Sequence, residues 1–500
     1  MRSYAFRQKL QELHIALLNK EKSKALATDF FNSPIIQQYA DRFASELPNR
    51  GDVLSYREFC NRISAAEVVL FGDFHTHRQS QRQFLRCLRQ SAKTSARRRL
   101  AIALEAFTTD DQASIDAYMC GKISERTFLE RTRYFTKWRF HWPHFKMILE
   151  FAKEHSLLVY GIELPSRVGG DRDAHFAAQL ARIASDKNVR RVFALIGEHH
   201  LTNDKIPMHL HSLMHRRPTL RVYQNVDHCY QYSETAHTST SPTYLDLGGA
   251  RLCVLNSPAW HKWKTASEWD DFDEIEVGEF PRKQFAGDLD YEFMLSAKTL
   301  LEFFNLPISE EVLDYYSLTP LQHKGRTRSP ATQLMLDAGG VAISNSSRKV
   351  LMSKLNFNYI AQAAGQFVFT SGERASKSQG GVAGAFLQMA AGAFSSLLMN
   401  PKRKITRLGT AECHLRTIIP QSQTSIGEFL SALKSASLSD DEPVMLQVAA
   451  TMGSAVGSLL FSMSLSQEHC ADVSRQLFTP HADRLNDSAI IAQIAEAVGF

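Results

Sequence analysis

The stretch 68–77, with the sequence VVLFGDFHTH, constrains the fold of this chain more than any other. Its apolar first half predicts a buried strand, and that strand ends in a glycine, a carboxylate and two histidines. Open α/β sheets keep their ligand sites at the carboxyl ends of parallel strands. We therefore expect a site around His75, with partners supplied by other strand ends.

Comparable strand ends recur along residues 52–230, where short apolar runs alternate with helical segments. This alternation is typical of βαβ units around a parallel sheet. The predicted strands end near Glu105, near Glu163 and at the run Gly197-Glu198-His199-His200. We predict an α/β fold with a mostly parallel sheet flanked by helices, in which these ends line one crevice.

Two of these strand ends share the pattern Gly-x-x-His, which places His75 and His200 in equivalent positions. Glycine permits a tight turn, and an imidazole supplies a neutral nitrogen ligand or a base near neutral pH. Together with Glu105, the two histidines fit either a divalent metal site or an acid–base pair. The remaining histidines, His77 among them, are more often surface or core residues.

The length of 500 residues exceeds what one hydrophobic core usually serves. We predict a helical lead-in over 1–46, an α/β domain over 47–305 and an all-α C-terminal domain over 306–500. Two apolar stretches in the last domain, 380–399 and 444–465, approach the length of a membrane span. Because they are rich in Ala, Gly and Ser, we expect buried helices and no membrane span.

Composition limits which binding partners and which cellular compartment we expect for this chain. A net charge of +6 with no nucleic-acid-binding motif argues against a nucleic-acid partner. The seven cysteines never form a C-x-x-C pair, which favours reduced thiols over disulfides or a structural zinc site. The first residues carry no secretory apolar region, so we expect a cytoplasmic protein.

Two segments near the predicted crevice offer further contacts. A helical insert over 108–155 is dense in aromatic residues, and Trp138, His141 or His144 could contact a ligand, although such aromatics more often fill a core. The helix after the opening stretch carries arginines at spacings of three and four, which usually mark a solvated face. Only Arg78 and Arg82 lie close enough to the strand end to contact anionic ligand groups.

Several of these motifs, taken in order and spacing, resemble the ChaN-like haem-binding uptake family of the Tiki and erythromycin-esterase superfamily. The matching segments are 69–75, 104–107, 138–145, 161–163 and 197–200. The resemblance covers about residues 60–230 and implies an α/β core whose site combines both Gly-x-x-His elements with Glu105. ChaN-like members are associated with haem or iron acquisition. Tiki-like members look like metal-dependent peptidases, and the esterases open a lactone with a His/Glu site.

Position by position, His75, Glu105 and His200 match the family motif, while His144 and Glu163 match it more loosely. Asp73 stands where the family usually has Glu. The chain also lacks the lipoprotein signal of ChaN proteins and adds a long helical C-terminal region.

The expected cofactor is haem or a divalent metal ion. We expect His75, Glu105 and His200 to ligate the metal ion. We expect the same three residues, together with Glu163, to have catalytic roles. The further residues expected to contact the cofactor are Asp73, Arg78, Trp138, His144 and His199.

Three functions follow as hypotheses. A haem carrier would use the histidines and the aromatic insert, with Arg78 and Arg82 near the propionates. A metal-dependent hydrolase of an ester or amide would polarise water on the metal, with Glu163 or Asp73 as base. A scaffold would keep only a vestigial crevice. The expected partner is a small molecule or haem, and a homodimer is compatible with the sequence.

Overall fold

The computed structural model divides the chain into two compact units. The α/β unit comprises Ile15–Ala236 and Ser241–Pro281, and the helical unit comprises Met1–His14, His237–Thr240 and Arg282–Phe500. Helix α1 (Ser3–Leu26) has residues in both units. The domain boundaries proposed from the sequence, at 46 and 305, stay predictions. The structure describes residues 3–28, 31–93, 99–215, 217–270, 289–306, 317–320, 330–344, 349–370, 381–403, 411, 427, 429–431, 443–479 and 487–499.

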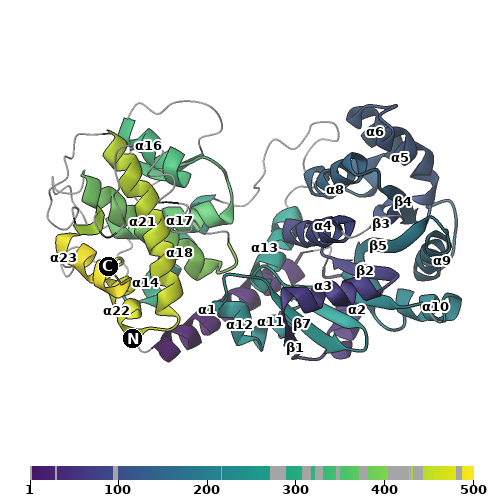
Figure 1. Cartoon of the computed structure of the whole chain (residues 1–500), viewed down its shortest axis with the longest axis horizontal. Coiled ribbons are helices and arrows are strands. Elements are labelled where there is room, and N and C mark those ends of the chain that lie inside the picture. Colours follow the sequence, from purple (N-terminus) through teal and green to yellow (C-terminus); the bar gives the residue numbers. More distant parts are fainter. Residues whose placement is uncertain are drawn as a thin grey trace. The chain divides into compact units, whose positions relative to one another are not determined.

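The α/β unit is built on an eight-stranded sheet with the order β1-β7-β8-β6-β2-β5-β3-β4 (Figure 1). The strands are β1 (Asp52–Leu54), β2 (Val68–Asp73), β3 (Arg99–Thr108), β4 (Leu158–Glu163), β5 (Val189–Gly197), β6 (Thr219–Gln224), β7 (Thr243–Gly248) and β8 (Arg251–Leu255). The strands from β8 to β4 in this order pair in parallel, and β7 pairs antiparallel with both β8 and β1. The predicted mostly parallel sheet is confirmed.

Strand β2 occupies an interior position and is buried along its whole length. Its Phe71 contacts Phe84 edge-on, with ring centroids 5.2 Å apart, and stacks on Phe193 of β5 at 5.9 Å. Burial on both faces explains why the sequence of β2 is a continuous apolar run. In the sheet, β5 and β3 lie to one side of β2, whereas β6 lies to its other side. The direction in which the chain adds strands to the sheet therefore reverses at β2. Such a switch point opens a crevice at the strand ends.

Helices flank this sheet (Figure 1). They are α2 (Pro34–Glu46), α3 (Tyr56–Ala65), α4 (Arg78–Lys93), α5 (Gln112–Met119), α6 (Glu125–Thr132), α7 (Tyr134–Lys137), α8 (Trp142–Glu154), α9 (Arg172–Ala184), α10 (Ile206–Leu213), α11 (Asp227–Gln231), α12 (Glu234–Thr238) and α13 (Ala259–Asp270). Helices α5 to α8 form the insert predicted over 108–155. Several of its aromatic side chains are buried, namely Phe128, Tyr134, Trp142 and Phe145, so much of the aromatic density fills a core.

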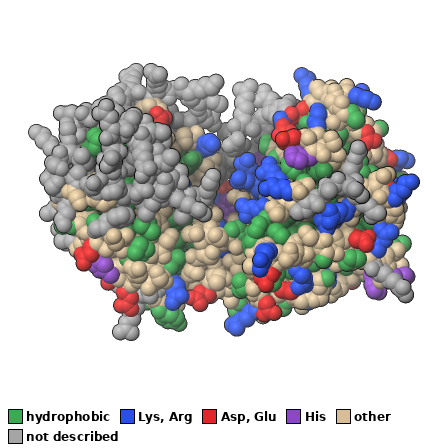
Figure 2. Space-filling model, viewed as in Figure 1, with side chains coloured by type: hydrophobic (Ala, Val, Ile, Leu, Met, Phe, Trp, Pro, Cys, Tyr) green, Lys and Arg blue, Asp and Glu red, His purple; other side chains and the backbone are tan. Residues whose placement is uncertain are grey.

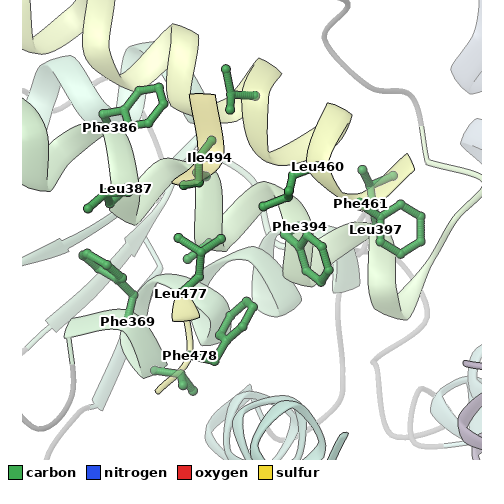
Figure 3. Close-up of a cluster of buried hydrophobic side chains, with 14 of the residues drawn as sticks. Phe369, Phe386, Leu387, Phe394, Leu397, Leu460, Phe461, Leu477, Phe478 and Ile494 are labelled. Atoms are coloured by element: carbon green, nitrogen blue, oxygen red, sulfur yellow. The ribbon is translucent and has the colours of Figure 1, made fainter. Parts of the chain in front are cut away.

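The helical unit packs around a second apolar core (Figure 3). Its helices are α14 (Leu289–Phe303), α16 (Pro330–Gly339), α17 (Phe357–Thr370), α18 (Val382–Met399), α21 (Pro443–Ser464), α22 (Glu468–Gln476) and α23 (Asp487–Ala497). The helical C-terminal region is confirmed, but it also contains a three-stranded sheet of β10 (Val341–Ser344), β11 (Lys349–Met352) and β9 (Ser317–Pro320). The all-α prediction missed this sheet because strands of four residues are too short to establish a period.

Helices α18 and α21 contain the two apolar stretches noted in the sequence. By length and composition, Val382–Met399 and Met445–Ser464 could each cross a membrane, but 89% and 61% of these windows are buried in the structure. Such burial is consistent with the expected core helices. The two helices approach closely at Gly453, where a Cβ atom would lie 2.1 Å from the carbonyl oxygen of Phe386.

We expect Gly453→Ala to destabilise the helical unit by about 1–3 kcal/mol, because the added methyl group would overlap a backbone carbonyl that cannot rotate away. Urea unfolding followed by circular dichroism measures the change. Gly169→Ala is the matched control, since its Cβ would meet nothing within 4 Å. Equal unfolding free energies for the two variants would contradict the close approach.

Candidate functional site

The ends of β2 and β5 lie side by side at the carboxyl edge of the sheet. Their parallel register pairs Asp73 with Gly197, so the two Gly-x-x-His elements leave the sheet with an offset of one residue. Glu105 belongs to β3, the other neighbour of β5. The sequence predicted that this strand would end near Glu105, but β3 continues to Thr108 through a register irregularity between Leu104 and Thr108.

The three residues expected at the centre of the site converge. The Nε2 atom of His75 lies 3.8 Å from Oε2 of Glu105, and the Nε2 atom of His200 lies 3.7 Å from Oε1. The carboxylate is 4% exposed, whereas the two imidazoles are 21% and 18% exposed. A ligand from solvent would therefore meet the histidines first, with the carboxylate behind them.

Each imidazole is held by a separate aspartate. The Nδ1 atom of His75 lies 3.0 Å from Oδ2 of Asp73, and the Nδ1 atom of His200 lies 2.6 Å from Oδ1 of Asp173. A carboxylate at Nδ1 fixes the ring orientation and favours the tautomer whose Nε2 carries a lone pair. Both histidines can therefore act through Nε2 as a ligand or as a base.

Asp173 was missed by the sequence reasoning. It lies in the first turn of α9, where an acidic residue is common for helix stability alone, so the sequence carried no signal of its role. Burial acts to raise the pKa of Asp173, but the hydrogen bond to His200 and the nearby Lys205 hold it below its ordinary value. This carboxylate is therefore ionised at neutral pH and can hold the imidazole.

Glu105 is tied to the backbone and to Arg172, a second residue that the sequence did not single out. Its Oε2 accepts a hydrogen bond from the Gly197 N–H at 2.6 Å, and its Oε1 accepts one from Arg172 at 3.1 Å. Burial acts to raise the pKa of Glu105, but His75, His200 and then Arg172 outweigh burial and lower it. The buried carboxylate is therefore negatively charged and fully engaged.

Glu163 is the last residue of β4 and joins the cluster through Arg172. It forms a two-pronged ion pair with Arg172, at 3.0 Å from Nε and 2.5 Å from the terminal nitrogen. Arg172 thus bridges Glu163 and Glu105, and these charges raise its pKa against the effect of burial. The structure brings Glu163 to the site as a partner of Arg172, with no direct contact to either histidine recorded among the described residues.

Gly197 leaves open space at the centre of the cluster. A Cβ atom at this position would lie 3.3 Å from Nε2 of His75 and 3.5 Å from both Oε2 of Glu105 and Cδ2 of His200. The absence of a side chain therefore keeps room directly between the three functional groups. This observation gives a physical reason for glycine in the second Gly-x-x-His element.

An aromatic wall lies beside His75. Its ring meets Trp138 edge-on, with centroids 4.5 Å apart, and Phe140 at 4.8 Å. Phe140 in turn stacks on Trp269 at 4.9 Å. Within the described part of the chain, the buried Nε1 atom of Trp138 has no hydrogen-bond partner. Trp138 therefore lies against His75 with a buried donor still to be satisfied, and its contact with a ligand stays a prediction.

Other candidate residues lie apart from this centre. His199 packs against Phe43, with ring centroids 5.5 Å apart, and Glu198 points toward Lys262 at 3.3 Å. Both flanking residues of the second motif therefore face away from His200. His77 is buried, with Nδ1 3.0 Å from the Ser80 hydroxyl and Nε2 3.3 Å from the Ser257 hydroxyl, so it serves the core.

Arg78 and His144 are two further residues that the sequence predicted to contact the cofactor. Arg78 is exposed at the start of α4, where Lys and Arg side chains gather on the surface (Figure 2). Burial, and then the charges of His141 and Arg78, lower the pKa of His144 to about 3. The imidazole of His144 is therefore neutral at physiological pH.

The geometry does not amount to a preformed metal centre. Across the described ranges, no group of three or more His, Cys, Asp or Glu side chains has an arrangement that could hold a metal ion. Both oxygens of Glu105 accept hydrogen bonds, one from Arg172 and one from the Gly197 N–H. The two Nε2 atoms remain the available ligand groups.

Comparison with known proteins agrees with the resemblance noted in the sequence. Residues 59–169 match the family model described as haem-binding uptake, Tiki superfamily, ChaN. The matched segment includes His75 and Glu105 but not His200. The predicted resemblance is confirmed over this part of the chain.

Among solved structures, one similar chain is ChaN of Campylobacter jejuni, described as showing cofacial haem binding. The similarity has a TM-score of 0.32 and 12% sequence identity, and it covers 40% of this chain and 91% of that chain. No curated protein matches the chain.

The Asp73–His75 contact predicts a measurable titration. Burial acts to lower the pKa of His75, but Asp73 and Glu105 outweigh burial and raise it. The charged imidazole thus stabilises the fold at pH values below about 6.5, and this contribution is lost as the pH rises through the folded-state pKa. We expect Asp73→Asn to lower the pKa of His75, as measured by NMR titration of its ring protons.

Asp173→Asn is the control for this titration, because its carboxylate contacts His200 instead. It should leave the pKa of His75 nearly unchanged. If Asp73→Asn left that pKa unchanged as well, the Asp73 carboxylate would not be its main support.

Proposed function

We propose that the α/β unit, whose residues 59–169 match the ChaN-type haem-binding uptake family of the Tiki superfamily, binds haem at the carboxyl ends of β2, β3 and β5. One observation carries the proposal: His75 and His200 present their Nε2 atoms to the same partly exposed space, while aspartates engage both Nδ1 atoms. A neutral imidazole oriented in this way is a common axial ligand of haem iron.

The surroundings of His75 suit a large flat ligand. Trp138 and Phe140 flank its imidazole, and aromatic walls of this kind favour contact with the face of a porphyrin. The unsatisfied Trp138 N–H could donate to an oxygen acceptor on the ligand. Gly197 supports the same reading, because it leaves space beside the Nε2 atom of His75.

Two arginines could bind the propionates of haem. Arg78 is exposed three positions after His75, and Arg172 bridges Glu105 and Glu163. Arginine pairs with carboxylates through charge-assisted hydrogen bonds. Arg172 already has two acidic partners, so we favour Arg78 for this role. Bound haem would supply an iron centre for ligand binding or electron transfer, and this chain would supply the imidazole, the apolar wall and the cation.

Haem titration of the purified full-length chain tests the proposal. We expect a Soret band shifted from that of free haem and saturable binding, with His75→Ala and His200→Ala weakening affinity about tenfold or more. His211→Ala is the matched control, because His211 is exposed and outside the crevice. Circular dichroism confirms that each variant is folded.

Two results would overturn haem binding at this site. The first is a wild-type spectrum that stays identical to free haem. The second is saturable binding that survives in the folded His75→Ala/His200→Ala double variant, which would place the haem elsewhere on the chain.

Acid–base hydrolysis of an ester or amide is a second candidate, favoured by the two Asp–His pairs. Each pair has the form of an oriented general base, and the two Nε2 atoms face one carboxylate. Among the described residues, no group of three or more His, Cys, Asp or Glu side chains is arranged to hold a metal ion, which favours the metal-independent version.

Hydrolysis of a p-nitrophenyl ester measures this activity, first after chelator treatment and then with added Zn²⁺ or Mn²⁺. If the second candidate is right, His200→Ala lowers the rate by about a hundredfold or more, and His211→Ala does not change it. A rate equal to that of buffer under both conditions would exclude it for this substrate class. Failure of both haem binding and hydrolysis would leave the scaffold hypothesis.

A further inference from the structure

The exposed side of helix α4 carries only cations. The helix contains no aspartate or glutamate, and its large apolar side chains, Phe84, Leu85 and Leu88, are buried in the core of the α/β unit. All of its exposed side chains are basic, and they are Arg78, Arg82, Arg86, Arg89 and Lys93. We call these five residues the α4 cation face.

The five cations form one narrow row along the helix. Their spacings of three and four residues place them within about 80° of the helix circumference and along about 22 Å of its axis. Like charges at these spacings repel each other and destabilise a helix. In agreement, burial and then the charges of Arg78, Arg86 and Arg89 lower the pKa of Arg82. The α4 cation face therefore concentrates positive charge along one line.

These charges have no acidic counterpart in the described part of the chain. None of the five residues forms an ion pair there, whereas the exposed Arg126 of α6 pairs with Glu130 one turn away. Arg89 instead lies over the ring of Phe151 in α8, 5.5 Å from its centroid, which neutralises no charge. A ligand that supplies carboxylates or phosphates along the same line would compensate the row.

The surroundings of the row favour a linear acidic ligand. Helix α8 packs beside α4 and exposes Glu150 and Glu154. A membrane of anionic lipids would meet these carboxylates together with the arginines, whereas a single acidic segment can follow α4 alone. Single-stranded nucleic acid is usually held by aromatic side chains as well as by cations, and α4 exposes no aromatic side chain.

We propose that the α4 cation face binds an acidic segment of a partner protein, in which Asp or Glu recurs about once per helical turn. Arginine suits this role, because its planar guanidinium pairs with a carboxylate through two parallel hydrogen bonds. Binding would also relieve the repulsion within the row. Because α4 begins three residues after His75, the bound segment would lie beside the candidate site. Arg78 is also our candidate for the haem propionates, so the test leaves it unchanged.

Fluorescence anisotropy of a labelled synthetic peptide tests the proposal on the haem-free full-length chain. The peptide consists of alanine and glutamine, with glutamates that repeat the spacing of the five cations. A second peptide has the same composition, but its glutamates are spread around the helix. We expect the first peptide to bind at low ionic strength and to dissociate as salt is added. The second should bind about threefold more weakly or less.

A double variant locates the binding. Arg86→Gln/Arg89→Gln should weaken binding of the first peptide about threefold or more, because two exposed ion pairs are lost. Lys122→Gln/Arg126→Gln is the matched control, since it removes the same charge from exposed positions outside α4, and it should bind like the wild type. Circular dichroism confirms that both variants are folded.

The wild-type chain alone can overturn the proposal, by binding neither peptide or by binding both equally. Equal affinities of the two folded double variants would also contradict it. Vesicles containing phosphatidylserine and a DNA duplex are measured in the same way. Tighter binding of either one that Arg86→Gln/Arg89→Gln removes would assign the face to a phosphate ligand instead. Failure of the haem titration leaves the peptide result unaffected, so the two proposals fail separately.

Discussion

The buried carboxylate of Glu105 is the interaction on which the rest of the site depends. It accepts hydrogen bonds from the Gly197 N–H and from Arg172, and it faces the Nε2 atoms of His75 and His200. A buried charge is tolerated only when hydrogen bonds and opposite charges compensate it. These contacts therefore link β3, β5 and α9 at the site.

The two histidines reach equivalent positions by different routes. His75 is held by Asp73, only two residues away at the end of the same strand, whereas His200 is held by Asp173 from the first turn of α9. The first pair follows from local chain geometry. The second exists only because β5 and α9 pack together, so a change in the placement of α9 would alter His200 while leaving His75 in place.

In the helical unit, two helices that are long and apolar enough to cross a membrane have 89% and 61% of their windows buried. Helices α18 and α21 approach closely because glycine at 453 leaves no side chain between α21 and the carbonyl of Phe386. Buried polar side chains also find partners across the helices, as when the Ser395 hydroxyl donates to the carbonyl oxygen of Ala361. Close packing and satisfied polar groups are typical of a protein core.

The sequence by itself determined the parallel α/β fold, the resemblance to ChaN-like proteins and the convergence of His75, Glu105 and His200. These follow from local patterns, because an apolar run predicts a strand and parallel strands bring their carboxyl ends together. Tertiary structure alone decided the roles of Asp173 and Arg172 and the packing of His199 against Phe43. Each of these depends on contacts between elements distant in sequence, which no local pattern encodes.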